Sequence, residues 1–219
     1  MANFAVHVRT AAFVSSTLAI FGVSLNVLSV SHLPWFVLVG TFGGMLPDID
    51  AAQSKPVRLL YHLLALLSAI TFLSIAKNQA PSYLLLLIAL GIYGITRYAI
   101  LVSIRQFTVH RGIFHSLIAL FFFALLMICI MYYIFKQNAL TAWLNGLFLA
   151  VGFFVHLLLD EIYSVDLSNR RLKKSFGSAL KLFNYKNVWS SLFIASLTIY
   201  LFLLSPPLPT SLRMIVFQK

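Results

Sequence analysis

The acidic residues of this chain are few, and they lie in short segments that also carry histidine. Only five of the 219 residues are acidic, namely Asp48, Asp50, Asp160, Glu161 and Asp166. Asp48 and Asp50 lie two residues apart in a turn after a proline, where both carboxylates can reach one ion. His156 and Asp160 are four residues apart, so in a helix they share one face and can share a metal ion. These spacings indicate metal-binding chemistry.

A third segment has the sequence HRGIFHS and runs from His110 to Ser116. His110 and His115 supply two imidazoles, and Arg111 supplies a guanidinium. Each of the three segments also has a plainer interpretation: an Asp-rich turn after proline, an interfacial basic turn, and a His–Asp pair at a helix end. Together they favour a metal site, provided that the fold brings them to one place.

The ligand types narrow the choice of metal without deciding it. Imidazole and carboxylate without thiolate suit zinc, manganese, iron or magnesium. With four or more candidate ligands a dinuclear site is also open, in which two ions about 3.5–4 Å apart would clamp the attacking and leaving oxygens of a displacement.

The elements that must position these residues are membrane helices. The chain is 61% hydrophobic and only 10% charged, and its mean hydropathy is +0.94, whereas a soluble domain averages about 25% charged residues. A chain this apolar cannot present a polar surface on all sides, so lipid must solvate part of it. We therefore predict an all-α, polytopic membrane helical bundle that forms a single domain over residues 1–219.

Apolar stretches alternate with short polar breaks and predict about seven spans, since a helix needs about 20 residues to cross the hydrocarbon core. The predicted spans are 11–30, 33–47, 59–76, 82–104, 113–135, 139–160 and 188–205. The second is short and contains Gly40, Gly43 and Gly44, which predicts a re-entrant or broken segment. Arg9 precedes the first apolar run, which is long and lacks a clear cleavage site, so we expect a retained anchor.

Seven spans would place all three metal-binding segments at one membrane face. The N-terminus with His7, and the segments 47–58, 105–112 and 161–187, fall on this face together with most of the 16 Lys and Arg residues. The positive-inside rule makes it the cytoplasmic face. Acids near a span are costly unless they are paired or bound to metal. Their gathering at one face is therefore the main functional signal of the sequence.

The sequence LPDID from Leu46, with Ser54 shortly after it, the HRGIFHS segment, and His156 with Asp160 resemble the YdjM-like family of bacterial inner-membrane metal-dependent hydrolases. His7 matches a histidine that this family carries in its first helix. The resemblance covers residues 7 to about 166 in order and spacing. The chain departs from the family at Ala51, where His or Asp is common. A more distant similarity to zinc-dependent phospholipases C suggests a phosphoester substrate.

The resemblance implies a divalent metal ion, with zinc first and manganese or magnesium as alternatives, in a protein of the bacterial cytoplasmic (inner) membrane. The implied ligands are Asp48, Asp50, His115, His156 and Asp160. His7 and His110 are further candidates, either as ligands or as donors that orient the carboxylates.

This ligand set predicts a hydrolase that acts on a phosphoester or lipid headgroup at the cytoplasmic face. Arg111 would hold the phosphate bidentately. Glu161 follows a ligand and is the predicted general base, and a solvent-facing acid at a helix end is the alternative interpretation. Arg97 lies about two turns inside the fourth span, where it could bind the substrate anion, reach the interface or pair with an acid.

The segment at about 166–187 is basic and amphipathic. Its residues Leu172, Phe176, Leu180 and Phe183 recur at i, i+4, i+8 and i+11, a pattern that predicts a helix lying on an anionic leaflet rather than an arm that docks a protein. The expected partners are membrane lipid and a lipid or phosphoester substrate. Nucleic acid is not expected, because cytoplasmic loops and lipid headgroups account for the positive charge. The oligomeric state is open.

Other classes of function also fit these residues. The same ligands could serve a non-enzymatic metal-binding or regulatory scaffold. A cation transporter would instead place its carboxylates near mid-bilayer and contain internal repeats, and we find neither in the sequence.

Overall fold

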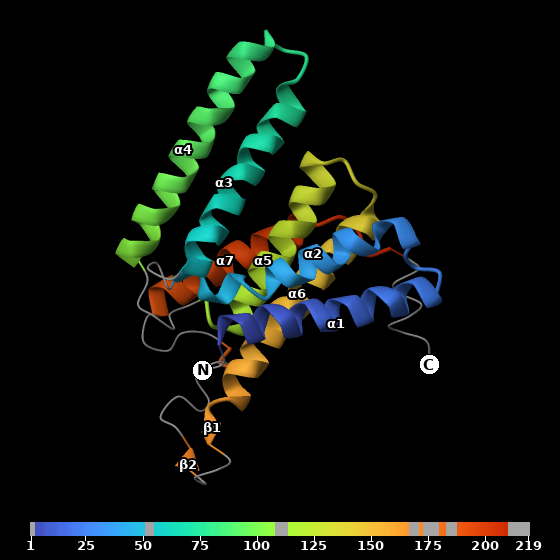
Figure 1. Ribbon diagram of the computed structural model, residues 1–219, viewed down its shortest axis with the longest axis vertical. Helices are drawn as coiled ribbons and strands as arrows, with labels where there is room; N and C mark the ends of the chain where they lie inside the picture. The colour runs from blue at the N-terminus through green and yellow to red at the C-terminus, as the bar shows by residue number, and fades with distance from the viewer. Residues whose placement is uncertain are drawn as a thin grey trace. The chain divides into compact units, whose positions relative to one another are not determined.

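The computed structural model describes residues 3–50, 55–107, 114–166, 171–172, 180–182 and 188–209. Its α-helices are α1 (Phe4–Ser24), α2 (Leu33–Gly43), α3 (Lys55–Ala76), α4 (Ser82–Phe107), α5 (Leu117–Cys129), α6 (Ala139–Ile162) and α7 (Val188–Leu204) (Figure 1). The 3-10 helices η1 (Val30–His32) and η2 (Leu46–Asp50) flank α2, and the π-helical segment η3 (Ile130–Ile134) extends α5. The two-residue strands β1 (Val165–Asp166) and β2 (Arg171–Leu172) pair antiparallel. The prediction of an all-α membrane bundle is confirmed.

Each of the seven predicted spans overlaps one α-helix, but the helices differ in length. Four segments are long and apolar enough to cross a membrane: α1, Ser82–Ala99 of α4, Leu117–Ile134 and α6. The apolar helices Tyr61–Ala76 and α7 are shorter. Helix α2 has 11 residues, which gives it a length of about 16 Å against a hydrocarbon core of about 30 Å. The second segment is therefore short, as its glycines indicate.

The first helix lies closer to the N-terminus than predicted. It begins at Phe4 rather than near residue 11 and ends at Ser24 rather than near residue 30. The polar residues near its start do not interrupt it, because His7 turns into the protein interior. Asn26, two residues after the end of the helix, has φ 57°. Asparagine tolerates this left-handed conformation, which commonly closes a helix.

The chain forms two compact units, which are described separately. The first unit comprises Met1–Pro47 and Arg111–Lys219, and the second comprises Asp48–His110. In the first unit α6 packs against α1, α2 and α5, and α5 also contacts α7. Of the membrane-length window of α6, 61% is buried, compared with 11% for α4. Helix α6 is thus the core of the first unit.

Hydrogen bonds hold the helices of the first unit together at one end. The indole nitrogen of Trp35, near the start of α2, donates to Asn145 Oδ1 of α6 at 2.7 Å. The Trp143 indole donates to the carbonyl of Pro206 at 3.0 Å, and the Tyr133 hydroxyl donates to that of Leu204 at 2.7 Å. With these helices tied at one end, the start of α1, the end of α2, the start of α5 and the end of α6 meet at the other end.

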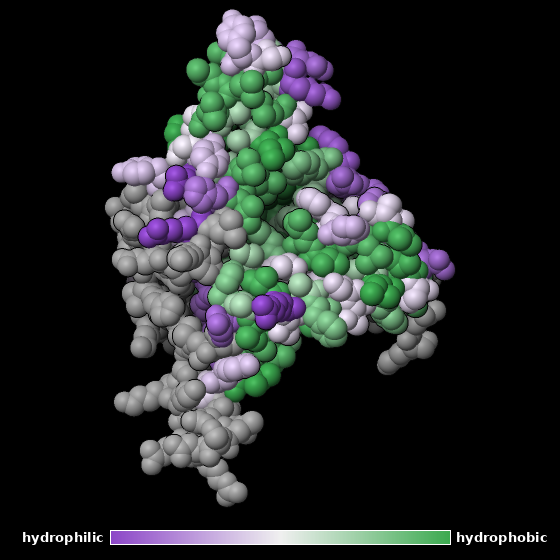
Figure 2. All heavy atoms as spheres, in the orientation of Figure 1, coloured by the Kyte–Doolittle hydropathy of each residue, from purple (hydrophilic) through white to green (hydrophobic). Residues whose placement is uncertain are grey.

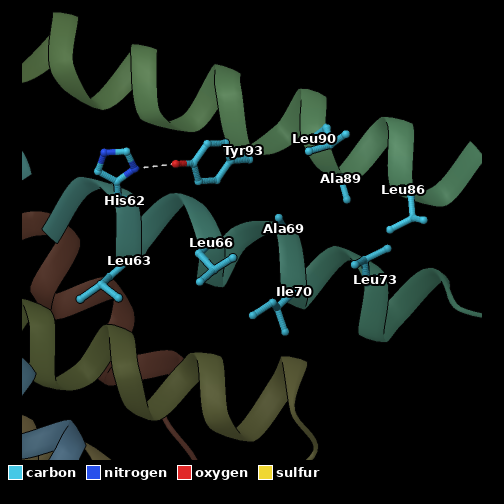
Figure 3. Close-up of a pocket in the computed structure, with 10 residues that line it drawn as sticks. All are labelled: His62, Leu63, Leu66, Ala69, Ile70, Leu73, Leu86, Ala89, Leu90 and Tyr93. Carbon is cyan, nitrogen blue, oxygen red and sulfur yellow. Dashed lines mark hydrogen bonds between the residues drawn. The ribbon is translucent and has the colours of Figure 1, made fainter. Parts of the chain in front are cut away.

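The second unit is an antiparallel hairpin of α3 and α4. His62 Nδ1 of α3 and the Tyr93 hydroxyl of α4 are hydrogen bonded at 2.5 Å. The pair lies at an otherwise apolar groove of about 450 Å³ between the two helices, lined by residues such as Leu66, Ala69 and Leu90 (Figure 3). The hairpin is held together mainly by apolar packing.

Large apolar side chains cover much of the surface in both units (Figure 2). Phe13 and Ile95 are both 72% exposed, and Leu203 is 75% exposed. Contiguous exposed apolar surface is rare on soluble monomers and marks contact with a nonpolar environment. These helices are therefore solvated by membrane lipid.

Candidate metal centre

Four buried side chains form a cluster in the first unit, namely His7, His115, His156 and Asp160. The last turns of α6 supply two of them. His156 and Asp160 are each only 1% exposed. As the spacing of four residues predicts, they lie on one face of the helix, and His156 Nε2 is 4.0 Å from Asp160 Oδ2. An ionised carboxylate buried in this way is costly unless a cation or hydrogen bonds compensate for its lost hydration. A cation beside its carboxylate would therefore stabilise ionised Asp160 in this buried position.

Of the three histidines, His7 of α1 makes the shortest contact with the Asp160 carboxylate. Its Nε2 lies 3.3 Å from Asp160 Oδ1, and its ring stacks on that of His156 with centroids 3.9 Å apart and planes inclined by 20°. The buried residues of α1 recur every four positions, at His7, Ala11, Ser15 and Ala19. Ser15 packs against Gly40 and Ala11 against Gly44, so these small residues let α1 lie close to α2, and His7 on the same face of α1 reaches the carboxylate of α6.

His115 approaches from just before α5. Its Nε2 is 3.7 Å from Asp160 Oδ2, and its ring meets that of His156 edge-on with centroids 5.7 Å apart. The next residue, Ser116, caps α5 by accepting a hydrogen bond from the Ala119 amide. The amide of Leu117 donates to the carbonyl of Lys181 at 3.0 Å. These bonds hold the backbone next to His115 in place.

Three imidazole Nε2 atoms thus face one buried carboxylate at 3.3–4.0 Å. A tetrahedral zinc ion with ligand bonds of about 2.0–2.1 Å holds its ligand atoms roughly 3.3 Å apart. Small side-chain adjustments would let His7, His156 and Asp160 hold one ion between them, and His115 is the candidate for a fourth ligand. Ligand atoms of His7, His156 and Asp160 all lie within 4.8 Å of one another. The donor set of three nitrogens and a carboxylate is one that zinc favours.

Hydrogen bonding within the cluster is incomplete. Both oxygens of Asp160 and both ring nitrogens of His7 are buried without a hydrogen-bond partner among the residues that the structure describes. Their mutual contact at 3.3 Å lacks hydrogen-bond geometry. Buried polar atoms are almost always satisfied, so these orphaned atoms indicate that the centre accommodates a further group.

A backbone carbonyl orients His156. Its Nδ1 lies 2.7 Å from the carbonyl oxygen of Gly44, in a buried hydrogen bond. A carbonyl can only accept, so Nδ1 carries the proton and the Nε2 lone pair of the neutral ring is left to face Asp160. Gly44 directly follows α2, where helix carbonyls have no intrahelical partner. Sequence reasoning missed Gly44 as a site residue, because it interpreted the nearby glycines only as a break.

The other predicted site residues are not among these four side chains. Asp48, half-buried in η2, and Arg97, exposed on α4, belong to the second unit, whereas the clustered side chains belong to the first. Asp50 ends η2, and its side chain lies outside the described residues, as do His110 and Arg111. Glu161 is half-buried in the last turn of α6, where its carbonyl accepts a hydrogen bond from Ser164.

Most of the predicted basic segment at 166–187 also lies outside the described residues. The structure describes Asp166 at the end of β1, residues 171–172 in β2 and residues 180–182. The amphipathic surface helix therefore stays a prediction.

A comparison with protein families gives one match over nearly the whole chain. The family described as YdjM inner membrane protein matches residues 1–204, a span that includes all of the described α-helices and the four clustered side chains. No curated protein and no solved structure matches the chain.

Proposed function

The chain belongs to the YdjM inner membrane protein family, and we propose that it is a metal-dependent hydrolase of that membrane. One observation carries the proposal: the Nε2 atoms of His7, His115 and His156 surround the buried carboxylate of Asp160. The proposed metal is zinc, with manganese or magnesium as alternatives.

The four clustered residues are the proposed ligands. Asp48, Asp50 and His110 are proposed as additional ligands of the same ion or of a second one. Asp48 is joined by one peptide bond to Pro47, the last residue of the first part of the first unit, and His110 is five residues before His115. Chain connectivity therefore keeps these groups within a few residues of the cluster's own elements.

The proposed substrate is a phosphoester, such as a lipid headgroup, reached from the cytoplasmic leaflet. A metal ion in the cluster would polarise a phosphoryl oxygen and lower the pKa of a bound water. Arg111 is proposed to bind the phosphate through its bidentate guanidinium, and Arg97 is proposed as a second anion-binding group. Glu161, next to Asp160 in the chain, is proposed to accept a proton from the attacking water. The cytoplasmic orientation is proposed from the distribution of Lys and Arg.

The test is a substrate screen on the purified full-length protein loaded with Zn²⁺, using phosphomonoesters, phosphodiesters and phospholipids. We expect turnover that a chelator abolishes and added Zn²⁺ restores. Arg111→Lys keeps the charge but loses the bidentate fork, so its turnover should fall roughly 10- to 100-fold, corresponding to a charged hydrogen bond of about 1.5–3 kcal/mol. Its metal content should match that of the wild type. Full activity in Arg111→Lys would exclude Arg111 from the site.

A second candidate is a non-enzymatic metal-binding or regulatory scaffold. Complete burial favours it: the side chains of His7, His115, His156 and Asp160 are at most 3% exposed. Structural zinc sites use four protein ligands, whereas catalytic sites keep one position open for water. Bound metal without turnover on any substrate in the screen would select this alternative.

A further inference from the structure

Helices α2 and α6 cross with their backbones in direct contact. A Cβ added at Gly152 of α6 would lie 1.7 Å from the carbonyl oxygen of Gly40, and one added at Gly43 would lie 2.2 Å from that of Leu149. Real Cβ contacts essentially never fall below 3.0 Å, so a side chain at either position would force the helices apart. Small residues at such crossings are the usual means by which membrane helices approach closely.

This crossing lies one helical turn from the His156 hydrogen bond. Gly152 precedes His156 by four residues on α6, and Gly40 precedes Gly44 by four residues on α2. Gly152 also packs against Gly44 itself, since its added Cβ would be 2.9 Å from the Gly44 amide nitrogen. The bond from His156 Nδ1 to the Gly44 carbonyl, at 2.7 Å, therefore joins the same two helices at the level next to their closest approach.

The hydrogen bond depends on the separation of the two helices. To accommodate a Cβ at Gly152, the Gly40 carbonyl must recede by about 1.3 Å before the contact reaches 3.0 Å. A shift of this size at Gly44 would lengthen the 2.7 Å bond beyond the roughly 3.2 Å limit of ordinary N–H···O bonds. His156 would then lose the acceptor that keeps the proton on Nδ1.

We propose that Gly152 is a positioning residue of the metal centre. It lets α2 lie close enough to α6 for the Gly44 carbonyl to fix the His156 ring, so that Nε2 faces Asp160. The inference rests on the proposed metal site and extends it to a residue without a side chain. Partners that orient a ligating histidine typically contribute 10- to 100-fold to metal affinity.

Gly152→Ala tests this inference, with Gly146→Ala as the matched control. Gly146 is on the same helix, and its added Cβ would lie 2.4 Å from the Ile128 side chain of α5. The control therefore disturbs the packing of α6 away from the α2 crossing. In competition titrations with Zn²⁺ on full-length protein in detergent, Gly152→Ala should bind roughly 10- to 100-fold more weakly than wild type. Gly146→Ala should retain wild-type affinity. Wild-type affinity in folded Gly152→Ala, or equal weakening in both variants, would overturn the inference.

The tautomer of His156 supplies a readout that general packing would not change. In ¹⁵N NMR spectra of metal-free wild-type protein, His156 should carry its proton on Nδ1. In Gly152→Ala this preference should weaken. A wild-type His156 protonated on Nε2 would overturn the inference even if Gly152→Ala fails to fold. The titration and the spectrum together separate the two proposals. Failure of the wild type to bind Zn²⁺ in the titration would contradict the metal site, and the Nδ1 result would remain as an independent test of the Gly44 contact.

Discussion

The two units use the same residue types in different ways. In the first unit, three histidines lie 1–2% exposed around the carboxylate of Asp160. In the second, His62 shares a hydrogen bond with Tyr93 beside an apolar groove (Figure 3). Neutral imidazole and phenol can satisfy one another, whereas a buried carboxylate among imidazoles needs a net positive charge. The buried acid among the histidines therefore distinguishes the proposed metal centre from the pair of His62 and Tyr93.

The glycines show the same contrast. A Cβ at Gly152 in the first unit would collide with the backbone of α2, whereas one at Gly94 in the second unit would meet no other part of the described chain within 4 Å. The first unit uses glycine to bring backbones together beside polar side chains. In the hairpin of α3 and α4, glycine has no such role. The neighbours of a residue, rather than its type, decide its function here.

The largest difference between the two units is expected when the buried acid is removed. Asp160→Ala leaves three imidazoles without the carboxylate that holds them together, so metal content should fall from about one ion per chain to nearly none. His62→Ala in the hairpin is the control and should retain wild-type content. Elemental analysis of both purified variants provides the measurement. Retained metal in Asp160→Ala, or equal loss in His62→Ala, would show that the two units do not differ as proposed.

Substitution of a histidine of the cluster should cause the second-largest loss of metal content. His156→Ala and His7→Ala each remove one proposed ligand and should lower the metal content clearly. His32→Ala should not, because His32 is exposed in η1, where its Nδ1 is 2.9 Å from the Ser29 hydroxyl. Metal content per folded chain, measured after size-exclusion chromatography, tests the ranking. Similar losses in all three variants would point to general instability rather than ligation.

The same substitution should have opposite effects on stability in the two units. Gly94→Ala should raise the free energy of unfolding by roughly 0.5–1 kcal/mol, because glycine in a helix interior is less favourable than alanine. Gly152→Ala should lower it by about 1–3 kcal/mol, because its Cβ overpacks the crossing of α2 and α6. Unfolding in mixed detergent measures both. Equal signs would contradict the different roles assigned to these glycines.

The smallest effect is expected from Tyr93→Phe. It removes the hydroxyl bonded to His62 but keeps the ring beside the groove. Hydrogen bonds between membrane helices contribute about 0.6 kcal/mol on average, so the free energy of unfolding should fall by about this amount. The metal content should be unchanged. A loss of metal in Tyr93→Phe would show that the His62–Tyr93 hydrogen bond contributes to metal binding, contrary to this prediction.

The sequence was sufficient to predict the helical membrane fold and part of the centre. The four-residue spacing of His156 and Asp160 predicted that they share one helix face, as they do in the structure, and the HRGIFHS segment contains His115, which lies beside Asp160. His7 was only a second choice, yet it makes the shortest contact with Asp160. Its position depends on the small residues along one face of α1, and their packing partner could not be identified from the sequence.

The role of Gly44 could not be predicted for a different reason. Its carbonyl is a backbone group that every residue has, so no residue type indicates that it orients His156. The spacing of Gly40 and Gly44 was visible, and it fitted both a break in the second span and a close helix crossing. Only the close approach of α2 to Gly152 in the structure distinguishes the two.

The central proposal is that His7, His115, His156 and Asp160 together bind one metal ion through nitrogen and oxygen atoms. X-ray absorption at the zinc K-edge of purified, zinc-loaded full-length protein tests it most directly. We expect nitrogen and oxygen ligands at about 2.0–2.1 Å from the zinc ion, with the outer-shell scattering of about three imidazole rings. Failure to retain zinc, or a shell without imidazole scattering, would contradict it.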